Sequence, residues 1–207
     1  MTRYSAGARF YDVLSGERFV YRAGRIAGIR MLNLRPGDTV FDLGCGTGLN
    51  FPWLTEAVGA DGLVIGLDRS PDMLAMATRR IQTQGYPNVR LIEADATDFD
   101  PDEIRRLAGG PLDAVFASYA LSVVDDWHPA WERMSATLRP GGSAAIVDMS
   151  LPTGRAAVFG PVARLVCAIG GADLAAHPWR VLERSGTNVR HRILSGGHIH
   201  AVAALLP

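Results

Sequence analysis

The feature that most constrains the fold of this chain is a short apolar strand that runs directly into three alternating glycines. The stretch Val40-Phe-Asp-Leu-Gly-Cys-Gly-Thr-Gly48 is followed by Asn50 and a helical pattern. Glycine adopts positive φ and lets the backbone approach a ligand closely, while the start of a helix presents free N–H groups. Tight packing of strand against helix would explain such a loop as well. Interpreted as a ligand loop, it predicts a small-molecule site at a strand–helix junction.

The same alternation of strand and helix repeats along the chain. We expect strands at 39–43, 63–67, 89–93, 112–117 and 143–148, and helices at 17–34, 50–58, 71–84, after Pro101 and at 127–138. This order is typical of a doubly wound α/β sheet of the Rossmann-like kind, with ligands beyond the carboxyl ends of parallel strands. The last part differs, because 156–176 has an apolar helical pattern and 188–194 and 199–205 predict a closing β-hairpin.

Composition narrows the kinds of partner and the compartment. The 21 basic residues balance 21 acidic ones, and no long run of like charge indicates nucleic acid as a partner. The two cysteines, Cys45 and Cys167, suit a reducing cytoplasm. The first nine residues do not build toward an apolar run, so we expect no secretory signal. The apolar stretch 156–172 contains Pro161 and Arg164 and is too short for a transmembrane segment.

Three aspartates at successive strand ends indicate what the glycine loop binds. Asp42 precedes the loop, where it would repel a phosphate and attract an ammonium group. Asp68 ends the second strand, where a carboxylate can accept both hydroxyls of a ribose. Asp95 follows the third strand and is placed to accept from an adenine amine, although each aspartate alone fits a helix cap or turn. The glycine spacing also misses both the dinucleotide fingerprint and the phosphate-binding P-loop.

Together, Asp42-x-Gly44-x-Gly46-x-Gly48, Asp68 and Asp95-Ala96 resemble the cofactor motifs of the class I S-adenosylmethionine-dependent methyltransferases. The resemblance implies a seven-stranded sheet, mostly parallel, with an antiparallel C-terminal strand. It implies one domain over 1–207, with a helical cap (1–34), a cofactor-binding core (35–149) and an acceptor-side helix with closing hairpin (150–207). The cofactor-binding residues that it implies are Tyr11, Asp42, Gly44, Cys45, Gly46, Gly48, Asn50, Asp68, Arg69, Met73, Asp95, Ala96, Ser118 and Tyr119.

The methyl acceptor is less constrained by the sequence. Methyl transfer is an in-line displacement in which alignment supplies much of the rate, so a catalytic base is not obligatory. The candidates for a catalytic role are Tyr119, Asp148 and Tyr11. Tyr11 lies in an N-terminal segment similar to those of small methyltransferases acting on quinones or phospholipid amines. We therefore expect a small, apolar or lipid-like amine or hydroxyl acceptor.

Several alternatives stay open at this point. The stretch 156–172 could form a lid, touch a membrane surface as a peripheral contact, or be an ordinary buried helix. His198 and His200 share one face of the expected last strand, but no acidic or thiol ligand accompanies them, so we expect no metal. The same pocket would also suit a non-catalytic S-adenosylmethionine-binding module or an aminopropyl or aminocarboxypropyl transferase. A nicotinamide dehydrogenase is disfavoured by the glycine spacing.

Overall fold

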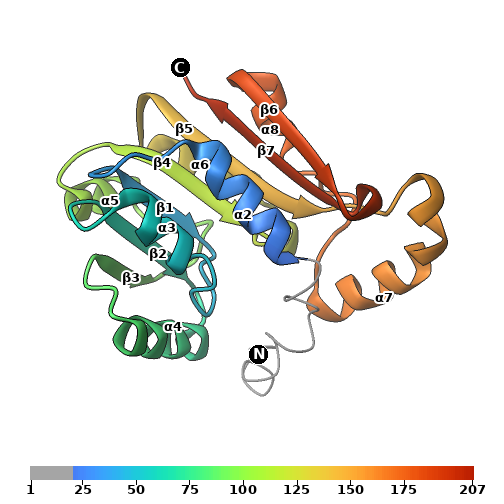
Figure 1. Ribbon diagram of the computed structural model, residues 1–207, viewed down its shortest axis with the longest axis horizontal. Coiled ribbons are helices and arrows are strands. Elements are labelled where there is room, and N and C mark those ends of the chain that lie inside the picture. The colour runs from blue at the N-terminus through green and yellow to red at the C-terminus, as the bar shows by residue number, and fades with distance from the viewer. Residues whose placement is uncertain (1–20) are drawn as a thin grey trace.

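The chain folds around one seven-stranded sheet (Figure 1). The structure is a computed structural model that describes residues 21–207. The strand order is β3-β2-β1-β4-β5-β7-β6, with β7 antiparallel to both of its neighbours. The strands are β1 (Thr39–Leu43), β2 (Leu63–Asp68), β3 (Val89–Glu93), β4 (Leu112–Ser118), β5 (Leu138–Met149), β6 (Thr187–Leu194) and β7 (Ile199–Leu205). The predicted doubly wound sheet with an antiparallel C-terminal strand is confirmed.

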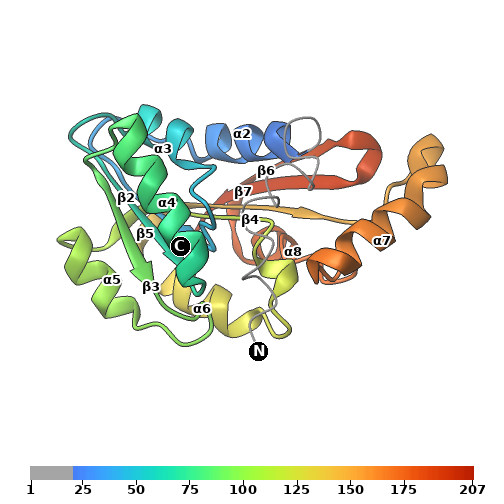
Figure 2. The same ribbon diagram turned by 90° about the horizontal axis from the view of Figure 1, so that it is seen from below.

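Helices cover both faces of the sheet, as Figure 2 shows. On one face lie α2 (Tyr21–Leu32), α3 (Phe51–Val58) and α4 (Pro71–Gln84), and on the other lie α5 (Pro101–Ala108), α6 (His128–Ala136) and α8 (Arg180–Ser185). Alternate strand residues therefore enter two separate apolar cores, and Phe41 and Val40 are both fully buried on opposite faces. This double burial explains why the central strands have nearly continuous apolar sequences.

Glycines bring α2 unusually close to the sheet. A Cβ at Gly24 would overlap Tyr119 Oη and come within 2.8 Å of Ile199 Cγ2. A Cβ at Gly28 would overlap Val147 and lie 2.8 Å from a ring carbon of Phe116. Because glycine weakens an isolated helix, its use at both positions indicates that close packing of α2 on β4, β5 and β7 outweighs helix propensity.

The register brings four strand ends to one edge of the sheet. Asp42 on β1 pairs with Gly66 on β2 and with Phe116 on β4. Asp68, the last residue of β2, pairs with Glu93, the last residue of β3. Four segments consequently lie next to one another, because parallel strands end at the same edge of a sheet. They are the glycine loop, the turn after β2, the turn at Asp95 and the end of β4 at Ser118.

The structure departs from the expected elements in two places. The helix predicted at 127–138 ends at Ala136, and β5 begins at Leu138 because that residue already pairs with Leu112. The expected helical stretch at 156–176 divides into a 3₁₀ turn η2 (Gly154–Phe159) and α7 (Gly160–Gly170), followed by the unforeseen α8. The start of the expected helix at Glu17 and the candidate Tyr11 lie outside the described residues.

Candidate functional site

The three loop glycines have different neighbours. All three have positive φ, between 55° and 78°. A Cβ at Gly44 would lie 2.5 Å from the Ala120 Cβ, and one at Gly48 would lie 2.5 Å from the Phe51 ring. Among residues 21–207, nothing lies within 4 Å of a Cβ placed at Gly46. Gly44 and Gly48 are therefore required for packing as well as for backbone conformation, whereas Gly46 faces open space that a ligand can occupy.

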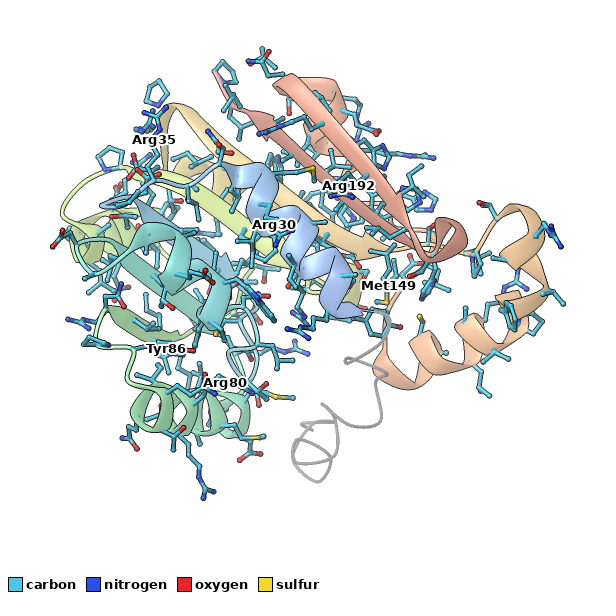
Figure 3. All side chains as sticks on the ribbon, viewed as in Figure 1. Arg30, Arg35, Arg80, Tyr86, Met149 and Arg192 are labelled. Atoms are coloured by element: carbon cyan, nitrogen blue, oxygen red, sulfur yellow. The ribbon has the colours of Figure 1, made fainter. Side chains whose placement is uncertain are left out.

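Asp68 fastens this loop to the end of β2. One carboxylate oxygen accepts from the Gly46 N–H at 2.9 Å and the other from the Ser70 N–H at 2.9 Å. Burial raises the pKa of Asp68, and these two backbone donors oppose the rise. Arg80 of α4, labelled in Figure 3, donates from Nε to the Thr47 carbonyl at 2.9 Å. Hydrogen bonds made by two side chains, Asp68 and Arg80, thus hold the loop in shape.

Asp42 and Asn50 form a buried polar pair beneath the loop. Asn50 Nδ2 lies 2.9 and 3.0 Å from the two Asp42 carboxylate oxygens and 3.1 Å from Ser118 Oγ. Asp42 is fully buried, and desolvation raises its pKa from 3.8 to about 7, although the Asn50 hydrogen bond and the Arg25 charge act in the opposite direction. The described contacts of Asp42 thus tie β1 to the start of α3.

Arg25 of α2 completes this cluster and was not foreseen from the sequence. Its Nη1 donates to Ser118 Oγ at 2.8 Å and to Asn50 Oδ1 at 3.3 Å. Its guanidinium also lies 4.9 Å from the centre of the Tyr119 ring. In sequence, Arg25 is one of several arginines on an ordinary helix, and only the docking of α2 brings it to the strand ends.

Tyr119 occupies a strained position at the end of β4. Its φ is 54°, a region that residues other than glycine rarely adopt and that concentrates at functional sites. Its hydroxyl donates to the Tyr21 carbonyl at 2.9 Å, and the two rings pack edge to face at 5.0 Å. Tyr119 therefore links the strand end to α2, with one side of its ring under Arg25.

The other residues singled out from the sequence lie around this edge. Asp95 is exposed and accepts from the Thr97 N–H at 2.8 Å and the Thr97 hydroxyl at 2.6 Å, which lower its pKa. Arg69 is exposed, whereas Met73 is only 7% exposed and packs within α4. Cys45 is buried, and desolvation raises the pKa of its thiol. Their cofactor contacts, and those of Ala96, stay predictions.

Asp148 lies near the end of β5 and holds the turn that follows β4. Its two oxygens accept from the Ser122 hydroxyl (2.6 Å), the Ser122 N–H (3.0 Å) and the Met149 N–H (2.9 Å). Asp148 is fully buried, and desolvation raises its pKa to about 6. These contacts describe a residue that positions the β4 turn; its predicted catalytic role is untested.

A second group of polar side chains lines an open pocket of about 640 Å³ beyond the ends of β5 and β6. The pocket is bordered by α8 and the segment before it. The lining residues include Ser150, Arg164, Asp173, His177, Trp179, Arg180, Glu183, His191 and His200. The Trp179 and His200 rings stack at 4.3 Å with planes 6° apart. The pocket therefore combines a flat aromatic wall with several titratable groups.

The sequence-based pairing of His198 with His200 on one strand face is wrong. Strand β7 begins at Ile199, and His198 precedes it, with Nδ1 2.6 Å from the Ser150 carbonyl and its ring beside Tyr21 of α2. His200 instead lies on the opposite side of the sheet, against Trp179. Within residues 21–207 no group of three or more His, Cys, Asp or Glu side chains is arranged to hold a metal ion.

The geometry can accommodate a nucleoside that carries a cationic tail. The Gly46 side of the loop offers open space, the Asp68 carboxylate lies at its rim, and the Asp42 cluster lies beneath it. A buried carboxylate with a pKa near neutrality gains most from a nearby cation, because the cation favours its charged form.

Comparison with known proteins agrees with this arrangement. Residues 40–142 match a family model described as a methyltransferase domain. The chain is 30% identical over 150 residues to a demethylmenaquinone methyltransferase of Oceanobacillus iheyensis, covering 72% of this chain and 60% of that protein. It is 30% identical over 142 residues to a demethylmenaquinone methyltransferase of Bacillus mycoides, covering 69% and 56%. The chain thus spans about three fifths of the length of these curated relatives.

Solved structures show the same fold at low sequence identity. A S-adenosylmethionine-dependent methyltransferase from Aquifex aeolicus is similar with a TM-score of 0.65 and 18% identity over the full length of both chains. A phosphoethanolamine N-methyltransferase 2 from Haemonchus contortus, in complex with S-adenosyl-L-methionine, is similar with a TM-score of 0.72 and 15% identity, covering 100% of this chain and 58% of that one.

Proposed function

Because the chain belongs to the class I S-adenosylmethionine-dependent methyltransferases, we propose that it transfers the methyl group of S-adenosylmethionine to a small apolar ring compound. The observation that carries the proposal is the open space at Gly46, which the Asp68 carboxylate borders. The polar cluster of Asp42, Asn50 and Arg25 lies beneath it. The acceptor would enter through the pocket that contains Trp179 and His200.

The residues at the strand ends fit the parts of the cofactor. Asp68 would accept from the ribose hydroxyls, and Asp95 with the backbone at Ala96 would contact the adenine. The Asp42 and Asn50 pair would attract the ammonium of the methionine portion, whose positive charge would lower the raised pKa of Asp42. Ser118 and Tyr119 would close the side where the sulfur lies. The strained backbone of Tyr119 supports this placement, because such strain is concentrated where function requires a fixed geometry.

When bound, S-adenosylmethionine supplies an activated methyl group on a positively charged sulfur. The contribution of the chain is to align the acceptor for in-line displacement and to exclude water. Asp148 holds the β4 turn through Ser122, and the Asp173 N–H donates to the Ser122 carbonyl at 2.8 Å. The β4 turn thus joins the cofactor edge to the pocket, since Asp173 also lines the pocket. A rigid connection of this kind would keep the two bound molecules in register.

The pocket also contains a pair of histidines suited to hold a proton. His191 Nε2 lies 2.9 Å from His200 Nδ1, and the outer nitrogens face the Glu183 carboxylate (3.0 Å) and the Gly197 carbonyl (3.2 Å). Each neutral imidazole carries one N–H group, so the pair has two hydrogen-bond donors. The three contacts need three donors, because their acceptors are the Glu183 carboxylate, one imidazole nitrogen and the Gly197 carbonyl. Desolvation and the neighbouring His191 lower the pKa of His200, so its imidazole is kept neutral and can take up the proton that would satisfy all three contacts. The pair would therefore accept the proton that a hydroxyl-bearing acceptor releases.

The acceptor class follows from the pocket and the curated relatives together. The Trp179 and His200 stack offers a flat surface for a planar ring. The curated relatives are named for demethylmenaquinone, a ring compound with an apolar tail. We favour a quinol-type acceptor over an amine, because the likeness to the phosphoethanolamine enzyme rests on the fold alone.

The cofactor assignment is tested by isothermal titration of the protein with S-adenosylmethionine, S-adenosylhomocysteine and NAD. We expect binding of the first two and none of NAD. Gly46→Val, which fills the open space and strains a positive φ, and Asp68→Ala should each weaken binding at least tenfold. Asp61→Ala removes an exposed carboxylate that precedes β2, at the opposite end of that strand from Asp68, and serves as the matched control. Unchanged affinity in both loop variants would overturn the assignment.

Turnover separates the proposal from the two other uses of the pocket. Methyl-labelled S-adenosylmethionine is incubated with reduced 1,4-naphthoquinone, catechol or phosphoethanolamine, and the products are identified by mass. A gain of one methyl group on the quinol supports the proposal. Transfer of an aminopropyl or aminocarboxypropyl group would contradict it. Tight cofactor binding without turnover of any acceptor in the panel would favour the non-catalytic module.

A further inference from the structure

Large apolar side chains gather on the outside of η2 and α7. Among the residues that the structure describes, seven large hydrophobic side chains are exposed, and four of them lie within eight residues of one another. These four are Val158 (74% exposed), Phe159 (64%), Val162 (61%) and Leu165 (64%). We call them the α7 patch. Figure 1 shows α7 projecting from the edge of the molecule, away from the sheet.

One contact of α7 with the rest of the protein is made by a small side chain. Cys167 is buried, whereas Val162 and Leu165 on the other side of the helix are exposed. Cys167 Sγ lies 3.7 Å from the sulfur of Met149, which Figure 3 places where β5 ends. The large side chains of the α7 patch follow i, i+3 and i+4 spacing on the other side. A helix that exposes several large apolar side chains on one side presents a contact surface.

The segment that carries the α7 patch has basic residues but no acidic ones, although Asp173 and Glu183 line the pocket together with Arg164. Residues 149–172 include Arg155 and Arg164 and no aspartate or glutamate. Both arginines are exposed. An apolar stripe flanked by basic residues, without acidic ones, matches the boundary of an anionic lipid layer, where the apolar side chains enter the acyl region and the guanidinium groups bind phosphates. The chain as a whole is neutral, with 21 basic and 21 acidic residues, so this bias is local.

We propose that the α7 patch docks the protein on an anionic phospholipid surface. Within residues 21–207 no helix has the length and apolar character needed to cross a bilayer, and α7 has 11 residues, so the contact is interfacial. A second copy of the chain is a poorer occupant. A stable protein interface buries roughly 800 Å² on each partner, more than four side chains on one short helix provide.

Docking by α7 also fits the position of the acceptor pocket. Arg164, on α7, lines that pocket together with Leu151 and Thr153 from the segment that leads to η2. A protein resting on its α7 patch would have the pocket mouth next to the lipid, where an apolar acceptor dissolves. The lipid contact itself goes beyond the proposed methyl transfer and needs neither cofactor nor acceptor, so the two can fail separately.

The test is flotation of the full chain with vesicles of phosphatidylcholine alone or mixed with phosphatidylglycerol, without cofactor. We expect binding to the anionic vesicles and little to the neutral ones. The double variant Phe159→Asp and Leu165→Asp should bind at least tenfold more weakly, because two exposed apolar side chains that would enter the lipid become charged. Ile193→Asp, at a side chain that is 60% exposed on β6 and outside the α7 patch, is the matched control and should bind normally.

The arginines have a separate signature. Arg155→Gln with Arg164→Gln should weaken anionic binding by roughly fivefold for each lost charge and reduce its sensitivity to salt. Circular dichroism and unfolding midpoints check that all variants fold. Absence of binding to anionic vesicles, or equal binding by the Phe159 and Leu165 double variant, would overturn the proposal. A dimer in light scattering that the same double variant dissociates would assign the α7 patch to a second copy instead.

Discussion

Replacing Asp42 with asparagine should change how the stability of the protein depends on pH. Asp42 is fully buried, and desolvation raises its pKa from 3.8 to about 7 against the opposing influence of Asn50 and Arg25. The folded state therefore keeps a proton that the unfolded state releases near its ordinary pKa. Stability from this group is present at low pH and is lost as the pH rises from about 4 to 7.

The size of the effect follows from the pKa values. A rise of about 3 units corresponds to roughly 4 kcal/mol in total, of which about 2 to 3 kcal/mol is lost between pH 5 and pH 8. Solvent screening does not reduce this figure, because the Asp42 side chain has no exposed surface. The asparagine variant does not titrate at this site. Any cost of placing its amide beside Asn50 Nδ2 is the same at both pH values and cancels in the comparison.

The assay is urea unfolding of wild type and Asp42→Asn at about pH 5 and pH 8 at one ionic strength. The wild type should lose about 2 to 3 kcal/mol more than the variant over that interval. Asp98→Asn, at an exposed position, should follow the wild type. Parallel losses in wild type and Asp42→Asn would mean that Asp42 is already ionised in the folded protein at the lower pH, and the desolvation argument would be refuted.

Three further outcomes are expected. Gly24→Ala should destabilise the fold by about 1 to 3 kcal/mol in urea unfolding, because its Cβ overlaps Tyr119. Gly160→Ala should not, because its Cβ meets nothing within 4 Å in the described part of the chain. Equal midpoints for the two variants would contradict the close packing of α2. Arg25→Met should weaken S-adenosylmethionine affinity about tenfold in titration calorimetry, since Ser118 and Asn50 lose a charged hydrogen-bond donor. Unchanged affinity would show that Arg25 does not contribute to cofactor binding. His191→Gln should lower turnover of a hydroxyl acceptor while leaving cofactor affinity unchanged, because His200 loses its imidazole partner. Unchanged turnover would exclude the histidine pair.

The order of helices and strands could be predicted from the sequence because most of them are set by residues that lie close together in the chain. Strand β1 has β-branched and aromatic residues, and α4 begins with Ser70 accepting from the Met73 N–H and ends at Gly85 with φ of 72°. Strand β7 was found for the same reason. The helix predicted at 127–138 ran too long, because its end is set by the pairing of Leu138 with Leu112 across the sheet. The short α8 lacks a clear periodic pattern and escaped prediction.

The residues of the candidate site could be predicted only where they belong to short motifs that are contiguous in the sequence. The glycine loop and Asp68 adjoin along strand ends whose order the α/β pattern dictates. Arg25 and the histidine pair come from an ordinary helix and from an edge hairpin, and nothing in their local sequence distinguishes them from solvated polar residues. His198 and His200 illustrate the reverse error, since strand β7 begins between them and their rings face different elements.

The sequence by itself determined the strand-and-helix alternation, the glycine loop and the aspartates beside it, because backbone preferences and hydrophobic period act over a few residues. Only the tertiary structure decided that Asp42 is buried with a raised pKa, that α2 brings Arg25 over Tyr119, and that the α7 patch faces outward. The physical reason is that desolvation, charge pairing and exposure depend on groups distant in the chain, and the packing of α2 and the β6–β7 hairpin on the sheet brings those groups together.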